Sequence, residues 1–188
     1  MSNRPESIYP YLVSATWVDS APVGSILSWQ VSDEIYLALV FDENGQVRNV
    51  RPADLDAHGL DESQAFDLAV RNLVAAGIAG QFSLGCATLL DGTEVGCARG
   101  NWMAPAAGLL FGNFHAALKE KFGVGAFAAV AVNQGCLFAF PTDDKTLASA
   151  SLRQAIDDEF TGHPNPVSRS WLLLDGQWPR AFPGKQAF

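Results

Sequence analysis

The sequence predicts an α+β fold in which a mixed or antiparallel sheet is covered by about three helices. The expected domain spans residues 1–176, and residues 177–188 form a tail that contains proline and glycine. Residues 126–140 resemble two apolar strands joined by a turn, and residues 35–50 resemble another hairpin. Helical and strand patterns alternate irregularly, whereas regular alternation would favour a parallel sheet. A chain of 188 residues can bury a core without metals or disulfides.

The first expected strands lie near the N-terminus. Residues 11–17 have the composition of a strand. Residues 35–41 are apolar on both faces, so we expect a central strand there. Asn44 and Gly45 can adopt the positive φ of a tight hairpin, so residues 47–50 should pair back against this strand.

The first expected helix begins at Asp61, with Gln64 completing a capping box, and ends at Gly77. Asn72 falls near the apolar stripe of this helix and should hydrogen-bond a neighbouring loop. The residues of the stripe recur at helical spacing: Ala65, Leu68, Ala69, Leu73 and Ala76.

The middle of the chain predicts a strand at residues 81–90 and an irregular loop at residues 93–103 that holds Gly96 and Gly100. Pro105 suits the first turn of a second helix. The buried stripe of that helix is expected to contain Ala107, Leu110, Phe111, Phe114 and Leu118.

A third helix should follow the two strands of residues 126–140. Thr142, Asp143 or Asp144 is expected to cap it, and residues 170–174 should form the closing strand. The inner face of this helix is expected to contain Ala148, Leu152, Ala155, Ile156 and Phe160.

Charge limits the classes of partner. The chain has 20 acidic and 12 basic residues, a net charge of −8. This charge repels nucleic acid and anionic membranes, so we expect neither as a partner, and it suits a protein with a basic surface. No run approaches the ~20 apolar residues that span a bilayer, and the N-terminus leads into no signal-like apolar segment. We expect a cytoplasmic protein.

The cysteines and histidines predict neither a cofactor nor a metal site. Cys86, Cys97 and Cys136 are odd in number and widely spaced, unlike a disulfide framework or a zinc site. We expect Cys86 and Cys136 in the core and Cys97 in an accessible loop. His115 should lie partly buried beside the stripe of the second helix.

Six residues are candidates for a binding site. Asp143 and Asp144 could hold a metal ion or raise one another's pKa, but we interpret them as helix-capping residues. His163, between Gly162 and Pro164, could present a positioned imidazole. The other three are Asn101 and Trp102 in the expected loop and Trp178, which with Phe182 could dock on a neighbouring chain or on this domain's own groove.

Two stretches resemble the YtpQ-like family of uncharacterised bacterial proteins. The first is residues 47–73, with Val50-Arg51-Pro52-Ala53-Asp54-Leu55 and Gly59-Leu60 before a helix that ends Ala69-Val70-Arg71-Asn72-Leu73. The second is residues 130–178, with Phe140-Pro141-Thr142-Asp143-Asp144, then His163-Pro164, and a closing strand from Trp171 to Gly176. Asp143 stands where the family pattern suggests arginine. The resemblance implies a cytoplasmic α+β protein and transfers no activity.

Three functional hypotheses follow. The leading one is a non-enzymatic binding or regulatory domain acting on a basic protein partner, because the chain has no GxSxG serine motif and no phosphate-binding glycine motif. The alternative is an enzyme or small-ligand sensor whose pocket combines residues 93–103 with Asp143, Asp144 and His163. The third is a homo-oligomer whose tail packs across the dimer.

Overall fold

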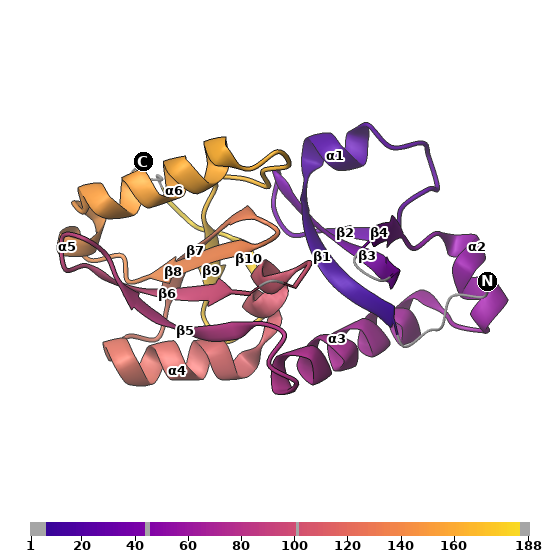
Figure 1. Cartoon of the computed structure of the whole chain (residues 1–188), viewed down its shortest axis with the longest axis horizontal. Coiled ribbons are helices and arrows are strands. Elements are labelled where there is room, and N and C mark those ends of the chain that lie inside the picture. Colours follow the sequence, from indigo (N-terminus) through magenta and orange to yellow (C-terminus); the bar gives the residue numbers. More distant parts are fainter. Residues whose placement is uncertain (1–6, 44–45, 101, 185–188) are drawn as a thin grey trace.

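Two antiparallel sheets lie side by side along the long axis of the molecule (Figure 1). The computed structural model describes residues 7–43, 46–100 and 102–184. Helices and antiparallel strands combine in one compact fold, which confirms the α+β class. The expectation of a single sheet was wrong, because the strands before and after residue 80 pair in separate sheets.

The first sheet is built around β3 (Ile35–Glu43), as the apolar run predicts. Strand β1 (Ile8–Ser14) pairs with one side of β3, while β2 (Ser28–Gln30) and β4 (Gln46–Asn49) pair with the other. The predicted hairpin is confirmed by the pairing of β3 with β4. Its turn, Asn44 and Gly45, lies outside the described residues.

The first strand begins and ends three residues earlier than predicted. Strand β1 ends at Ser14, and helix α1 (Ala15–Asp19) replaces the expected continuation to Trp17. The Ser14 hydroxyl accepts a hydrogen bond from the Trp17 amide at 3.3 Å, so it caps the helix. The strand composition of this segment is overridden by that local capping bond.

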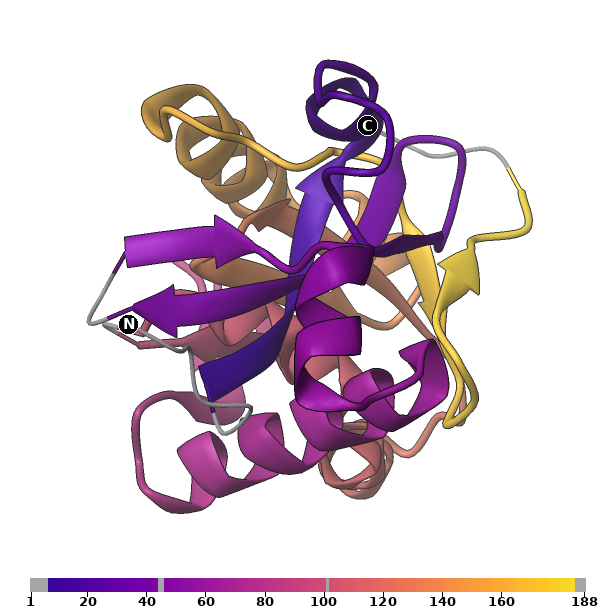
Figure 2. The same ribbon diagram turned by 90° about the vertical axis from the view of Figure 1, so that its right-hand side faces the viewer.

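Helix α3 (Glu62–Ile78) packs on the first sheet, with α2 (Pro52–His58) before it (Figure 2). Its capping box is confirmed: the Asp61 carboxylate accepts from the Gln64 amide at 2.8 Å, and the Gln64 side chain accepts from the Asp61 amide at 2.9 Å. The helix continues one residue past Gly77. The Asn72 side chain donates to the Ile8 carbonyl at 2.9 Å, which fastens α3 to β1 rather than to a loop.

The second sheet contains six strands in the order β10-β9-β7-β8-β6-β5. Every residue of β7 and β8 is buried, which confirms the predicted apolar hairpin. Helices α4 (Gly112–Phe122) and α6 (Ala150–Gly162) cover its opposite faces (Figure 1). The strands are β5 (Ser83–Thr88), β6 (Glu94–Arg99), β7 (Phe127–Asn133), β8 (Cys136–Phe140), β9 (Leu172–Leu174) and β10 (Arg180–Ala181).

The prediction of a loop at residues 93–103 was wrong. Six of these residues form β6, which pairs with both β5 and β8. Gly96 suggested irregular structure, but it permits close packing: a Cβ atom there would collide with Leu118 and press on Phe114 of helix α4. This glycine therefore serves helix–sheet packing.

Two predicted helices are each divided. A 3₁₀ helix, η2 (Pro105–Leu110), precedes α4 (Gly112–Phe122), and Phe111 between them has an extended backbone. Likewise α5 (Asp144–Leu147) precedes α6 (Ala150–Gly162). Asp143 caps α5 and Ser149 caps α6, so two caps replace the single expected one. The helical conformation is interrupted at these positions, so the buried residues of each predicted helix are divided between two shorter helices.

The main core lies between the two sheets and α4. It joins Leu12 and Leu37 of the first sheet to Phe127 and Leu137 of the second and to Phe114 of α4. A second cluster packs α6 on the other face of the second sheet. The two sheets are therefore held together by shared apolar burial.

The described part of the tail is joined to the second sheet. Strand β10 pairs with β9, and the Phe182 ring packs edge-on against Trp171 with centroids 5.6 Å apart. Arg180 and Asp175 form an ion pair at 2.6 Å across the connecting turn. The domain boundary at residue 176 stays a prediction. No described helix combines the length and apolar character needed to cross a bilayer.

Candidate functional site

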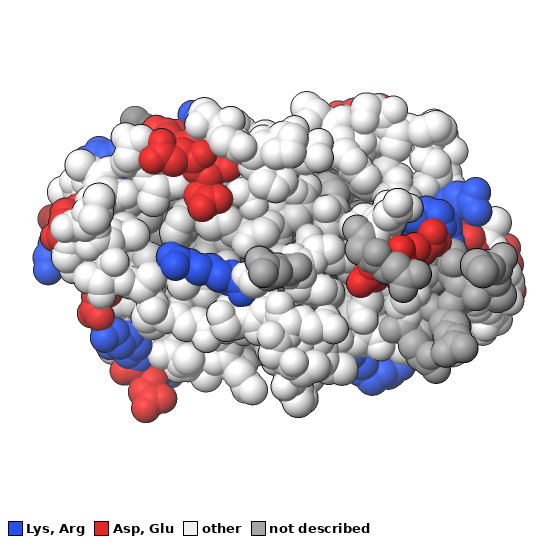
Figure 3. All heavy atoms as spheres, in the orientation of Figure 1, with Lys and Arg blue, Asp and Glu red and all other residues white. Residues whose placement is uncertain are grey.

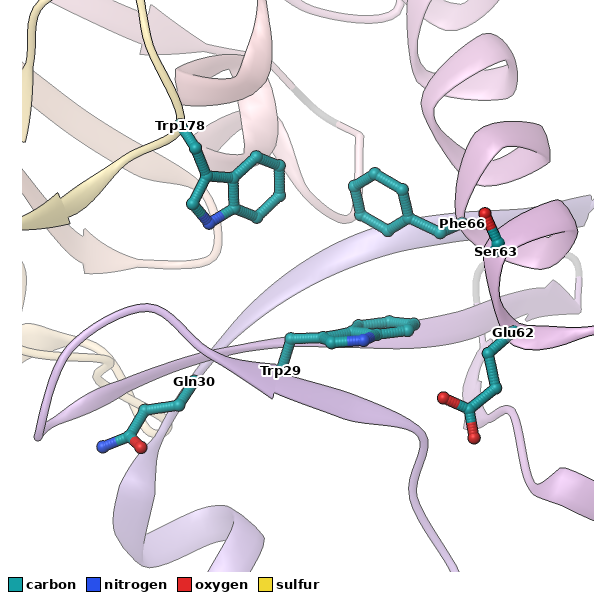
Figure 4. A pocket seen from close by; sticks show the side chains of 6 residues that line it. All are labelled: Trp29, Gln30, Glu62, Ser63, Phe66 and Trp178. Atoms are coloured by element: carbon teal, nitrogen blue, oxygen red, sulfur yellow. The ribbon is translucent and has the colours of Figure 1, made fainter.

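Three aromatic side chains surround a pocket of about 590 Å³ between the two sheets (Figure 4). Trp29 comes from β2, Phe66 from α3, and Trp178 from the segment between β9 and β10. The remaining lining residues are Gln30, Glu62 and Ser63. The pocket therefore combines residues that lie far apart in the sequence.

Phe66 stands between the two indoles. Its ring centroid lies 5.5 Å from that of Trp29 and 5.5 Å from that of Trp178, and both pairs are edge-to-face. Trp178 is 46 % exposed, an unusual fraction for tryptophan, while Trp29 and Phe66 are half-buried. Edge-to-face contacts fix the rings and still leave aromatic surface open to the pocket.

The N-terminal turn of α3 places three of the lining residues. The capping box at Asp61 starts the helix, so Glu62, Ser63 and Phe66 follow at helical spacing. Residues three and four positions apart share a helix face, which brings Glu62 and Phe66 to the same side. The apolar stripe of Ala65 and Ala69 is buried on the sheet and leaves Phe66 at its edge.

The turn before Trp178 is closed by Asp175. Its carboxylate pairs with Arg180 and accepts from the Gln177 amide at 3.2 Å, and Gly176 adopts φ 84°. The Arg180 guanidinium lowers the pKa of Asp175, so this link is charged at neutral pH. The indole of Trp178 is thus presented by a hydrogen-bonded turn rather than by an unstructured tail.

Glu62 supplies the only charged side chain among the lining residues of this pocket. It lies in the first turn of α3, where a carboxylate is also favourable to the helix dipole. Ring faces are electron-rich and attract cations, as does the carboxylate. The arrangement therefore favours a ligand that is both apolar and positively charged.

A smaller pocket of about 190 Å³ adjoins the first through Trp178. Its lining includes Phe111 and His115, and the His115 ring is bonded through Nε2 to the Gly125 carbonyl at 2.9 Å. His115 is half-buried in α4, next to the buried Phe114, as predicted. Because its Nε2 atom already has a partner, we assign this pocket to packing.

Asp143 acts as a helix cap. Its carboxylate accepts hydrogen bonds from the Thr146 amide at 2.9 Å and the Thr146 hydroxyl at 3.0 Å, and the amide bond is the main cause of its lowered pKa. Asp144 is exposed in the first turn of α5. These contacts agree with the capping interpretation of the pair.

The structure does not bring Asp144 and His163 together. Asp144 is the first residue of α5, which precedes α6, and His163 follows the last residue of α6, a helix of 13 residues that is about 20 Å long. The His163 Nδ1 atom accepts from the Asn165 amide at 3.2 Å, so it orders its own turn. General acid–base work needs hydrogen-bond reach, which this pair lacks.

Trp102 is partly buried against a core cluster that contains Phe82, and Asn101 lies outside the described residues. The Trp102 ring stacks on Phe82 with centroids 5.2 Å apart and meets Tyr9 edge-on at 5.1 Å. This packing gives Trp102 a structural role. Of the five predicted site residues that the structure describes, Trp178 alone lines the pocket of about 590 Å³.

Sequence reasoning missed the partners of Trp178. Glu62 and Phe66 share a helix face at the edge of the buried stripe, and this spacing was visible in the sequence. Their approach to Trp29 and Trp178 depends on the packing of two sheets, for which no local pattern exists.

The expectation for two cysteines was wrong. Cys86 is exposed on the edge strand β5, whereas Cys97 is buried in β6. Cys136 is buried as predicted, and burial raises the pKa of its thiol to about 12. Cys97 is buried rather than accessible because it lies in strand β6, which replaces the expected loop. The described residues contain no cluster of three or more His, Cys, Asp or Glu side chains suited to a metal ion.

No family model, curated protein or solved structure matches this chain. The resemblance to the YtpQ-like family therefore stays a prediction.

Proposed function

We propose that the protein is a binding domain that takes a basic protein partner at the pocket formed by Trp29, Phe66 and Trp178. The main observation is the pocket itself: three aromatic rings and one carboxylate gathered from separate elements. Exposed tryptophan is costly to leave unpartnered and is enriched at protein interfaces. The pocket thus has the composition of a contact site.

The charge of the molecule supports a basic partner. The net charge is −8, and Figure 3 shows acidic side chains gathered over α6. Asp157, Asp158 and Glu159 lie in the C-terminal half of that helix, where the helix dipole disfavours acids. One of them, Asp157, pairs with Arg169 at 3.2 Å. Such a field accelerates encounter with a cationic surface.

The pocket offers little for catalysis. Its polar lining residues are Gln30, Glu62 and Ser63. Glu62 and Ser63 are consecutive on a helix and do not face one another, so the carboxylate is poorly placed to activate the hydroxyl. This supports binding over an enzymatic role.

We propose the cytoplasm as the compartment. All three cysteines are free, and disulfides are rare in the cytosol but common outside it.

Affinity capture from the native cell's lysate tests the proposed function. The bait is the wild-type chain, with Trp178→Ala as the test variant and Trp17→Ala as the control, since Trp17 is half-buried on α1 and does not line this pocket. We expect a stoichiometric protein that wild type and the control retain, that Trp178→Ala loses, and that high salt releases. Equal retention by Trp178→Ala, or an on-rate independent of salt, would contradict the proposal.

A further inference from the structure

We propose that a separate pocket, between α1 and residues 164–166, binds an uncharged sugar through the indole of Trp17 and the amide of Gln134. Figure 1 shows α1 beside the segment that follows α6. The pocket has a volume of about 300 Å³, at the lower end of the range for small-ligand sites. It shares no lining residue with the pocket of about 590 Å³, so the inference does not rest on the proposed function.

The Gln134 amide is the main observation. The residue is buried, with 8 % of its surface exposed, and its side chain has no hydrogen-bond partner among the described residues. Buried polar groups in proteins are nearly always hydrogen-bonded, because an amide that leaves water unpaired loses the bonds it had there. Gln134 lines the pocket, so the surface that it keeps exposed opens there. A ligand in the pocket can therefore supply the partner that the protein does not.

The turn between β7 and β8 fixes the backbone that carries this amide. The Gln134 carbonyl accepts from the Ala106 amide at 3.0 Å, and the Gly135 amide donates to the Asn133 side chain at 2.8 Å. The Asn133 side chain in turn donates to the Glu159 carbonyl of α6 at 3.2 Å. The turn is thus held by its neighbours, and a ligand binds there without having to order it.

The other two walls of the pocket are also held by hydrogen bonds. At the start of α1, the Ala15 amide donates to the Glu34 carbonyl at 2.8 Å. Directly after residues 164–166, the Val167 amide donates to the Val132 carbonyl of β7 at 2.8 Å. The pocket is therefore formed before a ligand arrives, as is usual for small-molecule sites.

The polar groups of the lining favour an uncharged ligand. None of the described residues that line the pocket has an ionisable side chain. A charged ligand would lose its hydration without gaining an opposite charge. Hydroxyl and amide groups both donate and accept, so they suit a ligand whose own groups do both, as the hydroxyls of a sugar do. Such groups are provided by Ser14, Thr16, Ser20, Gln134 and Asn165.

The hydroxyls of the lining keep part of their hydrogen-bonding capacity. Ser14 and Thr16 share one bond at 2.9 Å, and Ser20 donates to the Trp17 carbonyl at 2.8 Å. A hydroxyl has one donor and two acceptor lone pairs, so local bonds of this kind leave sites for a ligand. The amide of Gln134 is nevertheless the strongest attraction, because it has no local bond at all among the described residues.

Trp17 supplies an apolar face. It is half-buried on α1 and belongs to none of the apolar core clusters formed by the described residues. The face of an aromatic ring is electron-rich and attracts the weakly positive C–H groups on the face of a pyranose ring. A sugar therefore matches the indole with its C–H face and Gln134 with its hydroxyls. An apolar ligand of the same size would leave the Gln134 amide unpaired.

The first test is titration of the full chain with neutral sugars, followed by saturation-transfer NMR. The probes are the methyl glycosides of glucose, galactose and mannose, with maltose and cellobiose. Three further probes test the chemistry: cyclohexanol lacks most of the hydroxyls, glucuronate adds a charge, and adenosine is a flat ring that can also bond an amide. We expect saturable binding of a neutral sugar with a Kd on the order of 1 mM for a monosaccharide. Salt should not change it, because no ion pair is formed.

Variants locate the binding. Trp17→Ala and Gln134→Leu should each weaken sugar binding about fivefold or more. Two controls should leave it unchanged: Val18→Ala on the same helix and Gln81→Leu at an exposed glutamine, neither of which lines the pocket. Because the two pockets share no residue, Trp17→Ala should lose the sugar and still retain a protein captured by wild type.

The melting temperature of Gln134→Leu gives an independent readout. An amide that holds the fold together costs stability when it is removed, whereas a buried amide without a protein partner does not. We therefore expect this variant to melt at the wild-type temperature or above it, while it loses sugar binding. A fall of more than about 4 °C would show a structural role for the amide and overturn the inference.

Other outcomes also overturn the inference. These are no saturable binding of any neutral sugar, cyclohexanol binding as tight as sugar binding, and wild-type affinity in Trp17→Ala or Gln134→Leu. Tighter binding of glucuronate than of the neutral sugars would contradict an uncharged ligand. Binding of adenosine alone would replace the sugar by a flat heterocycle. None of these results bears on the protein partner, whose capture depends on Trp178.

Discussion

The hydroxyl of Ser168 donates a hydrogen bond of 2.6 Å to the carboxylate of Glu34, and this bond links the two sheets. Glu34 lies immediately before β3, and the amide of Ser168 donates to the Ala131 carbonyl of β7 at 3.2 Å. Bonds from Ser168 and then Ser170 lower the pKa of Glu34. Ser168 is buried at 3 % exposure, so the link is shielded on one side.

This link predicts a pH dependence of stability. A carboxyl group whose pKa is lowered by folding stabilises the native state above its unfolded pKa of about 4.3, and the contribution is lost as pH falls through the folded pKa. Glu34→Gln should therefore flatten the acid limb of the free energy of unfolding, measured by urea denaturation between pH 3 and pH 7. Asp33→Asn, at an exposed neighbour, is the control. An unchanged acid limb in Glu34→Gln would contradict the assignment.

Removal of the hydroxyl should also cost stability at neutral pH. Ser168→Ala leaves the Glu34 carboxylate and the Ser170 amide without this partner. We expect a loss of about 1–3 kcal/mol, the range for hydrogen bonds to charged groups. A loss within experimental error would show that water replaces the hydroxyl.

Gly96 should tolerate no side chain. In Gly96→Ala the added Cβ collides with the end of the Leu118 side chain and lies 3.3 Å from the Ala139 carbonyl, so the buried Leu118 must repack. We expect a loss of about 1–3 kcal/mol by chemical denaturation. Gly85→Ala on the neighbouring strand has no atom within 4 Å of the new Cβ and should change stability by less than about 0.5 kcal/mol. Equal effects at both sites would refute close packing as the cause.

The native protein should expose one reactive thiol. Cys86 is exposed, whereas Cys97 and Cys136 are buried. A maleimide or Ellman assay should modify one cysteine per native chain and three after denaturation. Reaction at Cys86 should be slow near neutral pH, because partial burial raises the pKa of its thiol. Native Cys86→Ser should show no labelling over the time in which wild type is labelled once, and labelling of that variant would mean that Cys97 or Cys136 becomes accessible.

A chain ending at Gly176 tests the tail. The truncation removes β10 and uncovers Trp171, which is 2 % exposed beneath Phe182. We expect a loss of stability of about 1–3 kcal/mol, with Phe182→Ala showing the part due to the ring. Because the described tail packs on its own chain, light scattering should give the same oligomeric state for both chains. Dissociation on truncation would instead support a tail that packs across a dimer.

Local patterns predicted the parts of the fold that local physics determines. The apolar run of β3 specified a central strand, and Asp61 with Gln64 specified the start of α3. Strand β6 was missed because Gly96 signals a turn in isolation, and only contact with Leu118 reveals its packing role. Among the residues that line the candidate pocket, only Trp178 was predicted from the sequence as a site residue.

Trp29 could not be assigned to the site from sequence. Its approach to Phe66 depends on how β2 pairs with β3 and how α3 lies on that sheet. The residues named for the enzyme alternative are spread along the chain for a similar reason, since α6 separates Asp144 from His163. Both outcomes depend on long-range geometry rather than composition.

The pocket receives its walls from both halves of the molecule, Trp29 and Phe66 from one and Trp178 from the other. A ligand bound in the pocket therefore contacts both halves. It can bind only while the halves keep their spacing, and its binding energy opposes their separation. The affinity of the pocket for its ligand should therefore change when the spacing between the two halves changes. A substitution deep between the sheets could then alter binding without touching any residue of the pocket.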